Sequence, residues 1–167
     1  MTFPENLISK GFALKEIFAN DLDDYIKIKK LCYKKYVDEY YGGWVDDTQI
    51  KMNADIFEKT RKQTCFQKII LNGETVGFFG YDELEDRIGG ITIQMIEKAR
   101  NQGVGSFYLE QITRLSVKSV KPVFLKVFKS NPARNLYKRF GFVIYDETLT
   151  HYLMKYVPAT YAARCDY

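Results

Sequence analysis

The chain has 167 residues and carries 25 Lys and Arg against 21 Asp and Glu, a net charge of +4. This length suits one compact domain, and 46% hydrophobic residues with 16% aromatics argue for a packed core and against disorder. So small a positive excess is not the signature of a nucleic-acid-binding protein, although it favours an anionic ligand.

No run approaches the ~20 apolar residues of a membrane span, and the N-terminal residues lack the pattern of a signal peptide. The three cysteines, Cys32, Cys65 and Cys165, are odd in number and far apart, with no metal-ligand spacing. We therefore expect a cytoplasmic protein with reduced thiols, no metal site, and no membrane or nucleic-acid partner. The aromatic content suggests a homodimer as a hypothesis.

In chain order, the hydrophobic periodicity predicts a strand, two helices, three strands, a helix, a strand, a helix and two strands. These elements fall at residues 12–19, 22–41, 46–59, 65–71, 75–81, 88–96, 103–117, 123–128, 132–140, 142–145 and 151–156. Asn20 or Asp21 is the expected cap of the first helix, and residues 82–86 form an acidic loop. The order predicts a mixed α/β (α+β) sheet in one domain over residues 1–157, with a peripheral tail at 158–167.

Two glycine-containing turns have definite geometries. Asn72-Gly73 between two strand-like runs predicts a β-hairpin with a type I′ turn, because both residues tolerate positive φ angles. Gly141 is expected to end the last helix in a left-handed cap.

A glycine loop follows the isoleucine-rich strand at residues 88–96 and opens a helix. Its sequence is Arg100-Asn101-Gln102-Gly103-Val104-Gly105. A helix N-terminus presents unpaired N–H groups and a partial positive charge, and glycines allow close approach, so the loop suits a pyrophosphate. It is neither a Walker motif nor a dinucleotide fingerprint, since the place of the third glycine holds Tyr108. An ordinary turn before a helix explains the same pattern.

Two motifs together resemble the GNAT superfamily of N-acetyltransferases. The loop at residues 100–105 is similar to its Gln/Arg-x-x-Gly-x-Gly/Ala signature, and residues 125–142 look like its second half, where a strand leads to Asn131, then Leu136-Tyr137, then Gly141-Phe142. Gly43-Trp44 with acids after it resembles a subgroup, although Val45 is inserted before Asp46. The resemblance implies a mostly antiparallel central sheet of about six to seven strands, splayed at the cofactor site, with about four helices.

The resemblance also implies acetyl-CoA as the acyl donor and assigns roles to residues. The backbone of residues 93–96 is expected to meet the pantetheine arm, residues 101–106 the pyrophosphate, and Asn131 the arm again. The cofactor-binding residues expected on this basis are Ile93, Met95, Ile96, Arg100, Asn101, Gln102, Gly103, Val104, Gly105, Ser106 and Asn131. The basic residues that are candidates to bind the adenosine 3′-phosphate are Lys98, Arg100, Lys129, Arg134 and Lys138.

The implied reaction is the attack of an amine on a thioester, with Tyr137 as general acid. A phenol with a pKa of roughly 10 can protonate the departing thiolate, and the backbone N–H of Met95 or Ile96 can polarise the carbonyl. The alternative to this catalytic role is that Tyr137 is one more packed aromatic residue on an amphipathic helix. The general base stays open, because Lys126 and Gly89-Gly90 stand where the family places carboxylates, so a water relay is an option.

The acceptor is expected to be a small cationic amine, because acids stand at residues 46–47 and 82–86. The substrate-binding candidates are Trp44, Asp46 and Glu83. The alternative for each acid is a solvated loop residue, which is the more common role of such acids, and the alternative for Trp44 is core packing. His151 is interpreted as structural or as a weak substrate contact. Transfer of a longer acyl group, transfer to a protein amine, and a non-catalytic acyl-CoA-binding module remain as alternatives.

Overall fold

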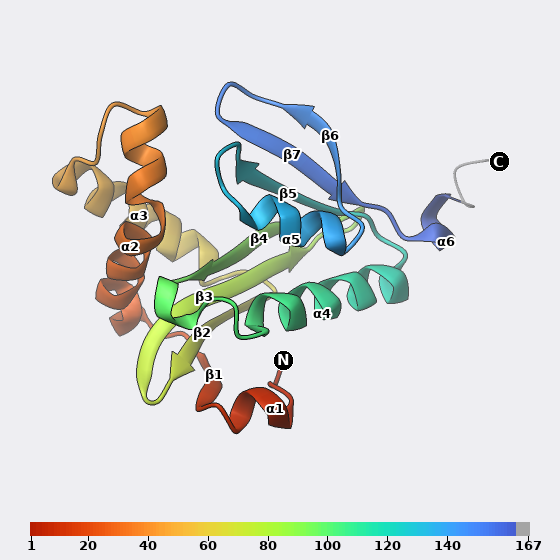
Figure 1. The fold of residues 1–167 in the computed structure, drawn as a ribbon, viewed down its shortest axis with the longest axis horizontal. Helices are drawn as coiled ribbons and strands as arrows, with labels where there is room; N and C mark the ends of the chain where they lie inside the picture. The colour runs from red at the N-terminus through yellow and green to blue at the C-terminus, as the bar shows by residue number, and fades with distance from the viewer. Residues whose placement is uncertain (163–167) are drawn as a thin grey trace. The chain divides into compact units, whose positions relative to one another are not determined.

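The computed structural model describes residues 1–162 (Figure 1). The last five residues of the predicted tail, which include Cys165, lie outside the described residues. The elements, in chain order, are α1 (Glu5–Ile8), β1 (Phe12–Glu16), η1 (Ala19–Asp21), α2 (Leu22–Tyr40), α3 (Asp46–Thr60), β2 (Cys65–Leu71), β3 (Glu74–Glu83), β4 (Ile88–Met95), η2 (Glu97–Ala99), α4 (Val104–Ser119), β5 (Val123–Phe128), α5 (Ala133–Arg139), β6 (Val143–Glu147), β7 (His151–Tyr156) and α6 (Ala159–Ala162).

Seven strands form one sheet in the order β1-β2-β3-β4-β5-β7-β6, and the predicted mixed α/β fold with a mostly antiparallel sheet is confirmed. The described chain divides into two compact units, of which the first comprises residues 1–81 and 92–104 and the second residues 82–91 and 105–162. A single domain over residues 1–157 stays a prediction.

In the first unit, β1 pairs antiparallel with β2, and β2 with β3. The hairpin turn between β2 and β3 has φ angles of 50° at Asn72 and 88° at Gly73, so the predicted left-handed conformations are present. Helices α2 and α3 lie side by side (Figure 1).

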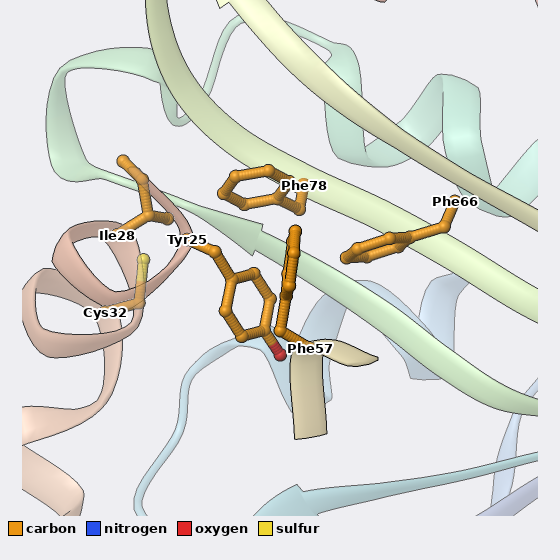
Figure 2. Close-up of a cluster of buried hydrophobic side chains, with 6 residues drawn as sticks. All are labelled: Tyr25, Ile28, Cys32, Phe57, Phe66 and Phe78. Atoms are coloured by element: carbon orange, nitrogen blue, oxygen red, sulfur yellow. The ribbon is translucent and has the colours of Figure 1, made fainter. Parts of the chain in front are cut away.

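The core of this unit is an aromatic cluster between the two helices and the strands (Figure 2). Tyr25 of α2 lies at its centre, with ring centroids 5.1 Å from Phe57, 5.3 Å from Phe78 and 6.1 Å from Phe66. All four side chains are buried, and each aromatic ring removes a large apolar area from water. The cluster therefore fixes α2 and α3 against β2 and β3.

In the second unit, β4 begins with a parallel pair between Ile88 and Val123, and β5 pairs antiparallel with β7, which pairs with β6. Helix α5 ends at Arg139, and Gly141, two residues later, has the predicted left-handed conformation with a φ of 83°.

Some elements depart from the predictions. The first strand ends at Glu16, and a 3₁₀ turn precedes α2; the Asp21 carboxylate accepts from the Phe18 N–H at 2.8 Å instead of capping α2. β3 continues through Glu83 into the predicted acidic loop. The short helices α1 and α6 were not predicted, because four residues are too few to show a helical period.

Candidate cofactor and catalytic residues

The end of β4 has two different backbone edges. The Ile96 N–H donates to the Val76 carbonyl of β3 at 3.0 Å. Because N–H groups alternate in direction along a strand, those of Ile93 and Met95 point away from β3. Two N–H groups were candidates to polarise a thioester carbonyl. That of Ile96 is hydrogen-bonded within the sheet, whereas that of Met95 points away from β3 and is the one that stays a candidate.

The glycine loop turns sharply before α4. Asn101 has a φ of 60° and Gly103 a φ of 98°, both left-handed, and α4 begins at Val104. A left-handed residue just before a helix turns the chain so that successive N–H groups can point to one side, as in anion-binding nests. This conformation, more than the presence of glycine, is what suits the loop to a pyrophosphate.

Long side chains of the loop bind backbone carbonyls. Arg100 Nε donates to the Met95 carbonyl at 2.8 Å, and Gln102 Nε2 donates to the Lys98 carbonyl at 2.9 Å. Lys10 Nζ approaches the Gln102 carbonyl at 3.4 Å. Arg100 thereby holds the loop to the end of β4 and Gln102 holds it to η2, so both side chains stabilise the loop geometry.

The thiol of Cys32 lies close to this loop. It is buried on α2, and burial raises its pKa, while the Arg100 guanidinium acts in the opposite direction. Because burial is the larger effect, Cys32 is a neutral thiol at pH 7 and serves as a small apolar core residue.

In the second unit, Asn131 lies in the short connection between β5 and α5. Its Oδ1 accepts from the Ala133 N–H at 2.9 Å, and its own N–H donates to the Phe128 carbonyl at 2.9 Å. The Asn131 side chain is held through its oxygen, and its Nδ2 hydrogens take no part in this contact.

Tyr137 is a buried residue of α5 with 6% exposure. Its ring centroid lies 6.1 Å from that of Phe142, and its carbonyl accepts from the Phe140 and Phe142 N–H groups at 3.0 and 3.1 Å. The left-handed Gly141 turns the chain back to allow this. The predicted motif Leu-Tyr followed by Gly-Phe is thus one structural unit that holds the Tyr137 ring in place.

The predicted acceptor acids are already bound by lysines. Asp46 pairs with Lys30 at 2.6 Å and accepts from Trp44 Nε1 at 2.9 Å, and these hydrogen bonds, Lys30 first, lower the pKa of the Asp46 carboxyl. The Trp44 N–H donates to Asp38 at 2.8 Å. Trp44 is thereby held to its own loop and to α2.

Glu83, the other predicted acid, pairs with Lys121 at 3.0 Å in the second unit. Asp46 and Trp44 belong to the first unit. Neither lysine partner was identified from the sequence, because Lys30 and Lys121 are distant in the chain from the acids that they bind and no local spacing indicates the pairs.

The basic candidates for a 3′-phosphate also have neighbours. Lys98 pairs with Glu74, Lys129 pairs with Glu147 at 3.0 Å, and the Arg134 guanidinium lies 5.2 Å from the centre of the Tyr152 ring.

His151 is packed against Phe128, with 4.0 Å between ring centroids, and its Nδ1 lies 2.7 Å from the Thr150 hydroxyl. Burial, followed by the Lys126 charge, lowers the pKa of His151. The contacts favour the structural interpretation of this residue.

Within residues 1–162, no group of three His, Cys, Asp or Glu side chains is arranged to hold a metal ion. None of the helices described there is both long and apolar enough to cross a membrane.

The chain belongs to the acetyltransferase (GNAT) family, whose model matches residues 29–142. The match includes the glycine loop, Asn131, Tyr137 and Gly141, and it confirms the resemblance found in the sequence. No curated protein matches the chain.

Solved structures share the fold at low sequence identity. A PaiA N-acetyltransferase from Thermoplasma acidophilum, in complex with coenzyme A, is 12% identical with a TM-score of 0.66 over 87% of this chain and 98% of its own. Ard1 from Thermoplasma volcanium is 20% identical with a TM-score of 0.63, over 89% and 98% of the two chains. The ribosomal-protein-S18-alanine N-acetyltransferase from Escherichia coli is 18% identical with a TM-score of 0.60, over 87% and 93%.

Proposed function

We propose that this protein is an N-acetyltransferase that moves the acetyl group of acetyl-CoA to a primary amine by direct attack. The observation that carries the proposal is the loop from Arg100 to Gly103, with left-handed Asn101 and Gly103, at the start of α4 in a chain of the GNAT family. Backbone N–H groups of residues 101–106 would bind the pyrophosphate, helped by the positive end of the helix dipole. The coenzyme A complex of the T. acidophilum protein supports this choice of donor.

The pantetheine arm is assigned to the edge of β4 that carries the Ile93 and Met95 N–H groups. An extended ligand can add to such an edge as a strand would. Ile96 would contribute to the same arm by van der Waals contact, since its N–H is used by Val76. Asn131 would donate from Nδ2, because Oδ1 is taken by the Ala133 N–H.

In the reaction, the amine nitrogen forms a bond to the carbonyl carbon and the carbon–sulfur bond breaks. Met95 N–H would stabilise the negative charge that develops on the carbonyl oxygen. Tyr137 would give its phenolic proton to the departing thiolate, since thiols and phenols have pKa values within about two units of each other. The proton of the amine would leave through water, because no carboxylate is assigned as the base.

The proposed acceptor is a small amine. A cationic one would have to compete with Lys30 for Asp46 or with Lys121 for Glu83, since both acids are paired. The Lys30–Asp46 pair is exposed and contributes little free energy, so an exchange at Asp46 costs little. The Lys121–Glu83 pair is partly buried, so an exchange there costs more.

The proposal is tested by the release of free thiol from acetyl-CoA in the presence of a panel of primary amines. Tyr137→Phe should lose about 10²–10⁴-fold in kcat while its affinity for acetyl-CoA is kept, because only the proton is removed. The matched control is Tyr156→Phe, which alters a second tyrosine that contacts the same Phe142 ring, with 5.7 Å between centroids, and should leave kcat unchanged.

A wild-type rate that Tyr137→Phe does not lower would contradict the role of Tyr137. Binding of acetyl-CoA without thiol release for any amine would favour a non-catalytic acyl-CoA-binding module. Propionyl-CoA and longer donors in the same assay decide the length of the acyl group.

A further inference from the structure

Gln94 is a buried glutamine whose polar atoms are unsatisfied. It lies on β4 between Ile93 and Met95 and is 3% exposed. Among the described residues, neither its Oε1 nor its Nε2 has a hydrogen-bond partner. A buried amide without partners destabilises the fold, so groups of this kind call for a physical explanation.

The position of Gln94 follows from the pairing of β3 and β4. Ile96 donates to Val76, and a Cβ at Gly77 would lie 2.9 Å from the Met95 Cγ, so Gly77 and Met95 are neighbours across the two strands. In an antiparallel pair with this register, Gln94 lies opposite Phe78.

The side chain of Gln94 therefore shares a face of the sheet with Phe78. Ile96, two residues further along, packs against the same aromatic cluster, as the alternation of a strand requires. Phe57, Phe66 and Phe78 offer no hydrogen-bonding groups. The one hydroxyl of the cluster, that of Tyr25, is hydrogen-bonded to Thr60. The amide thus lies on the face of the sheet that carries the aromatic cluster, and no described residue there accepts from or donates to it.

The proposed reaction has one assigned hydrogen-bond donor for the developing oxyanion, and a glutamine amide can supply a second. A thioester carbonyl that becomes an oxyanion is commonly stabilised by two donors, a backbone N–H and a second group such as a glutamine amide. Only one backbone donor is assigned here, that of Met95, because the Ile96 N–H is bound to Val76. Gln94 Nε2 is an unpartnered donor on the adjacent residue.

We propose that Gln94 is a catalytic residue whose Nε2 donates a hydrogen bond to the acyl carbonyl oxygen of the donor, beside the Met95 N–H. This inference rests on the proposed acyl transfer from acetyl-CoA. Oε1 is then left to accept a hydrogen from the attacking amine, so that both atoms of the amide are satisfied when both substrates are bound.

The test compares wild type with Gln94→Met, a near-isosteric apolar replacement, by calorimetric titration with acetyl-CoA and with free CoA. Free CoA has no acyl carbonyl. Gln94→Met should therefore bind CoA as wild type does and acetyl-CoA about 3- to 10-fold more weakly. The matched control is Gln67→Met on β2, whose Nε2 approaches the Met1 carbonyl at 3.4 Å, and which should change neither affinity.

A spectroscopic signature separates a direct contact from a structural effect. In infrared difference spectra with [1-13C]acetyl-CoA, the carbonyl band should shift to lower frequency on binding to wild type, and less on binding to Gln94→Met. The unliganded melting temperature of Gln94→Met should equal or exceed that of wild type, because two unsatisfied polar atoms are removed. Gln94→Leu repeats the comparison should the methionine variant not fold.

Equal affinities and equal carbonyl bands for wild type and Gln94→Met would overturn the role of Gln94 and leave the acyltransferase proposal intact. A variant that loses melting temperature and binds both ligands equally less well would also overturn it, since Gln94 would then be a structural residue. Wild-type protein that binds neither ligand would instead overturn the proposed function itself.

Discussion

Substituting Gly103 by alanine tests whether the left-handed glycine loop binds the cofactor. A Cβ at Gly103 would meet only the Leu7 Cδ2, at an ordinary distance of 3.7 Å, so crowding contributes no penalty. The φ of 98° does impose a penalty, because an L-residue with this backbone conformation is strained by about 1–2 kcal/mol.

This strain should appear in the affinity for acetyl-CoA. Gly103 is exposed, so the free loop can relax to a right-handed conformation in the alanine variant. Binding must then restore the original geometry, and a cost of about 1–2 kcal/mol corresponds to a dissociation constant about 5- to 30-fold higher. Calorimetry with wild type and Gly103→Ala measures the ratio directly.

Gly73→Ala is the matched control. Gly73 has a φ of 88° and open space around its Cβ position, but it lies in the β2–β3 hairpin turn. It should lower the melting temperature by about 2–8 °C through the same strain and leave the dissociation constant unchanged. Gly103→Ala protein that binds acetyl-CoA as tightly as wild type would refute the reasoning, because the loop conformation would then be irrelevant to the cofactor.

Two further predictions concern stability. Burial raises the pKa of Tyr25 to about 12, with the Thr60 hydrogen bond opposing it, so the folded state holds this proton more tightly than the unfolded state. The stability that this proton contributes is complete below pH 10 and is lost as the pH rises toward 12, by about 1.4 kcal/mol at pH 11. In urea unfolding, the free energy of unfolding of Tyr25→Phe should therefore rise relative to that of wild type by this amount between pH 8 and 11. A difference that stays constant with pH would contradict the claim. Val120 is a β-branched residue with a φ of 54°, a strained conformation for such a side chain. Val120→Gly should therefore raise the free energy of unfolding by about 0.5–1 kcal/mol. A lower free energy of unfolding would count against strain at this turn.

Local patterns in the sequence were sufficient for much of the fold. Asn72-Gly73 and Gly141 were predicted correctly because a positive φ depends on the residue itself and its immediate neighbours. The sheet and the main helices follow from hydrophobic periodicity, which acts over the same short range. The end of β3 was placed too early because Asp82 and Glu83 are poor strand formers that pairing holds in the sheet.

The side-chain partners of the candidate residues depend on contacts between distant segments. Lys30 with Asp46 and Lys121 with Glu83 bring together residues from different elements, and no spacing indicates them. The same holds for Arg100, whose charge suggested a phosphate contact and whose Nε binds the Met95 carbonyl. Gln94 did carry a signal, as a polar residue within an apolar strand, but its lack of partners is visible only in the structure.

The central claim, that this member of the GNAT family uses acetyl-CoA, is tested most directly by calorimetric titration of the wild-type protein with acetyl-CoA. Saturable binding of one equivalent with a dissociation constant of roughly 1 μM to 1 mM, the range of enzyme substrates, is the predicted result. Absence of heat and of any shift in melting temperature at millimolar acetyl-CoA would contradict the account, and would mean that the glycine loop serves only as a turn into α4.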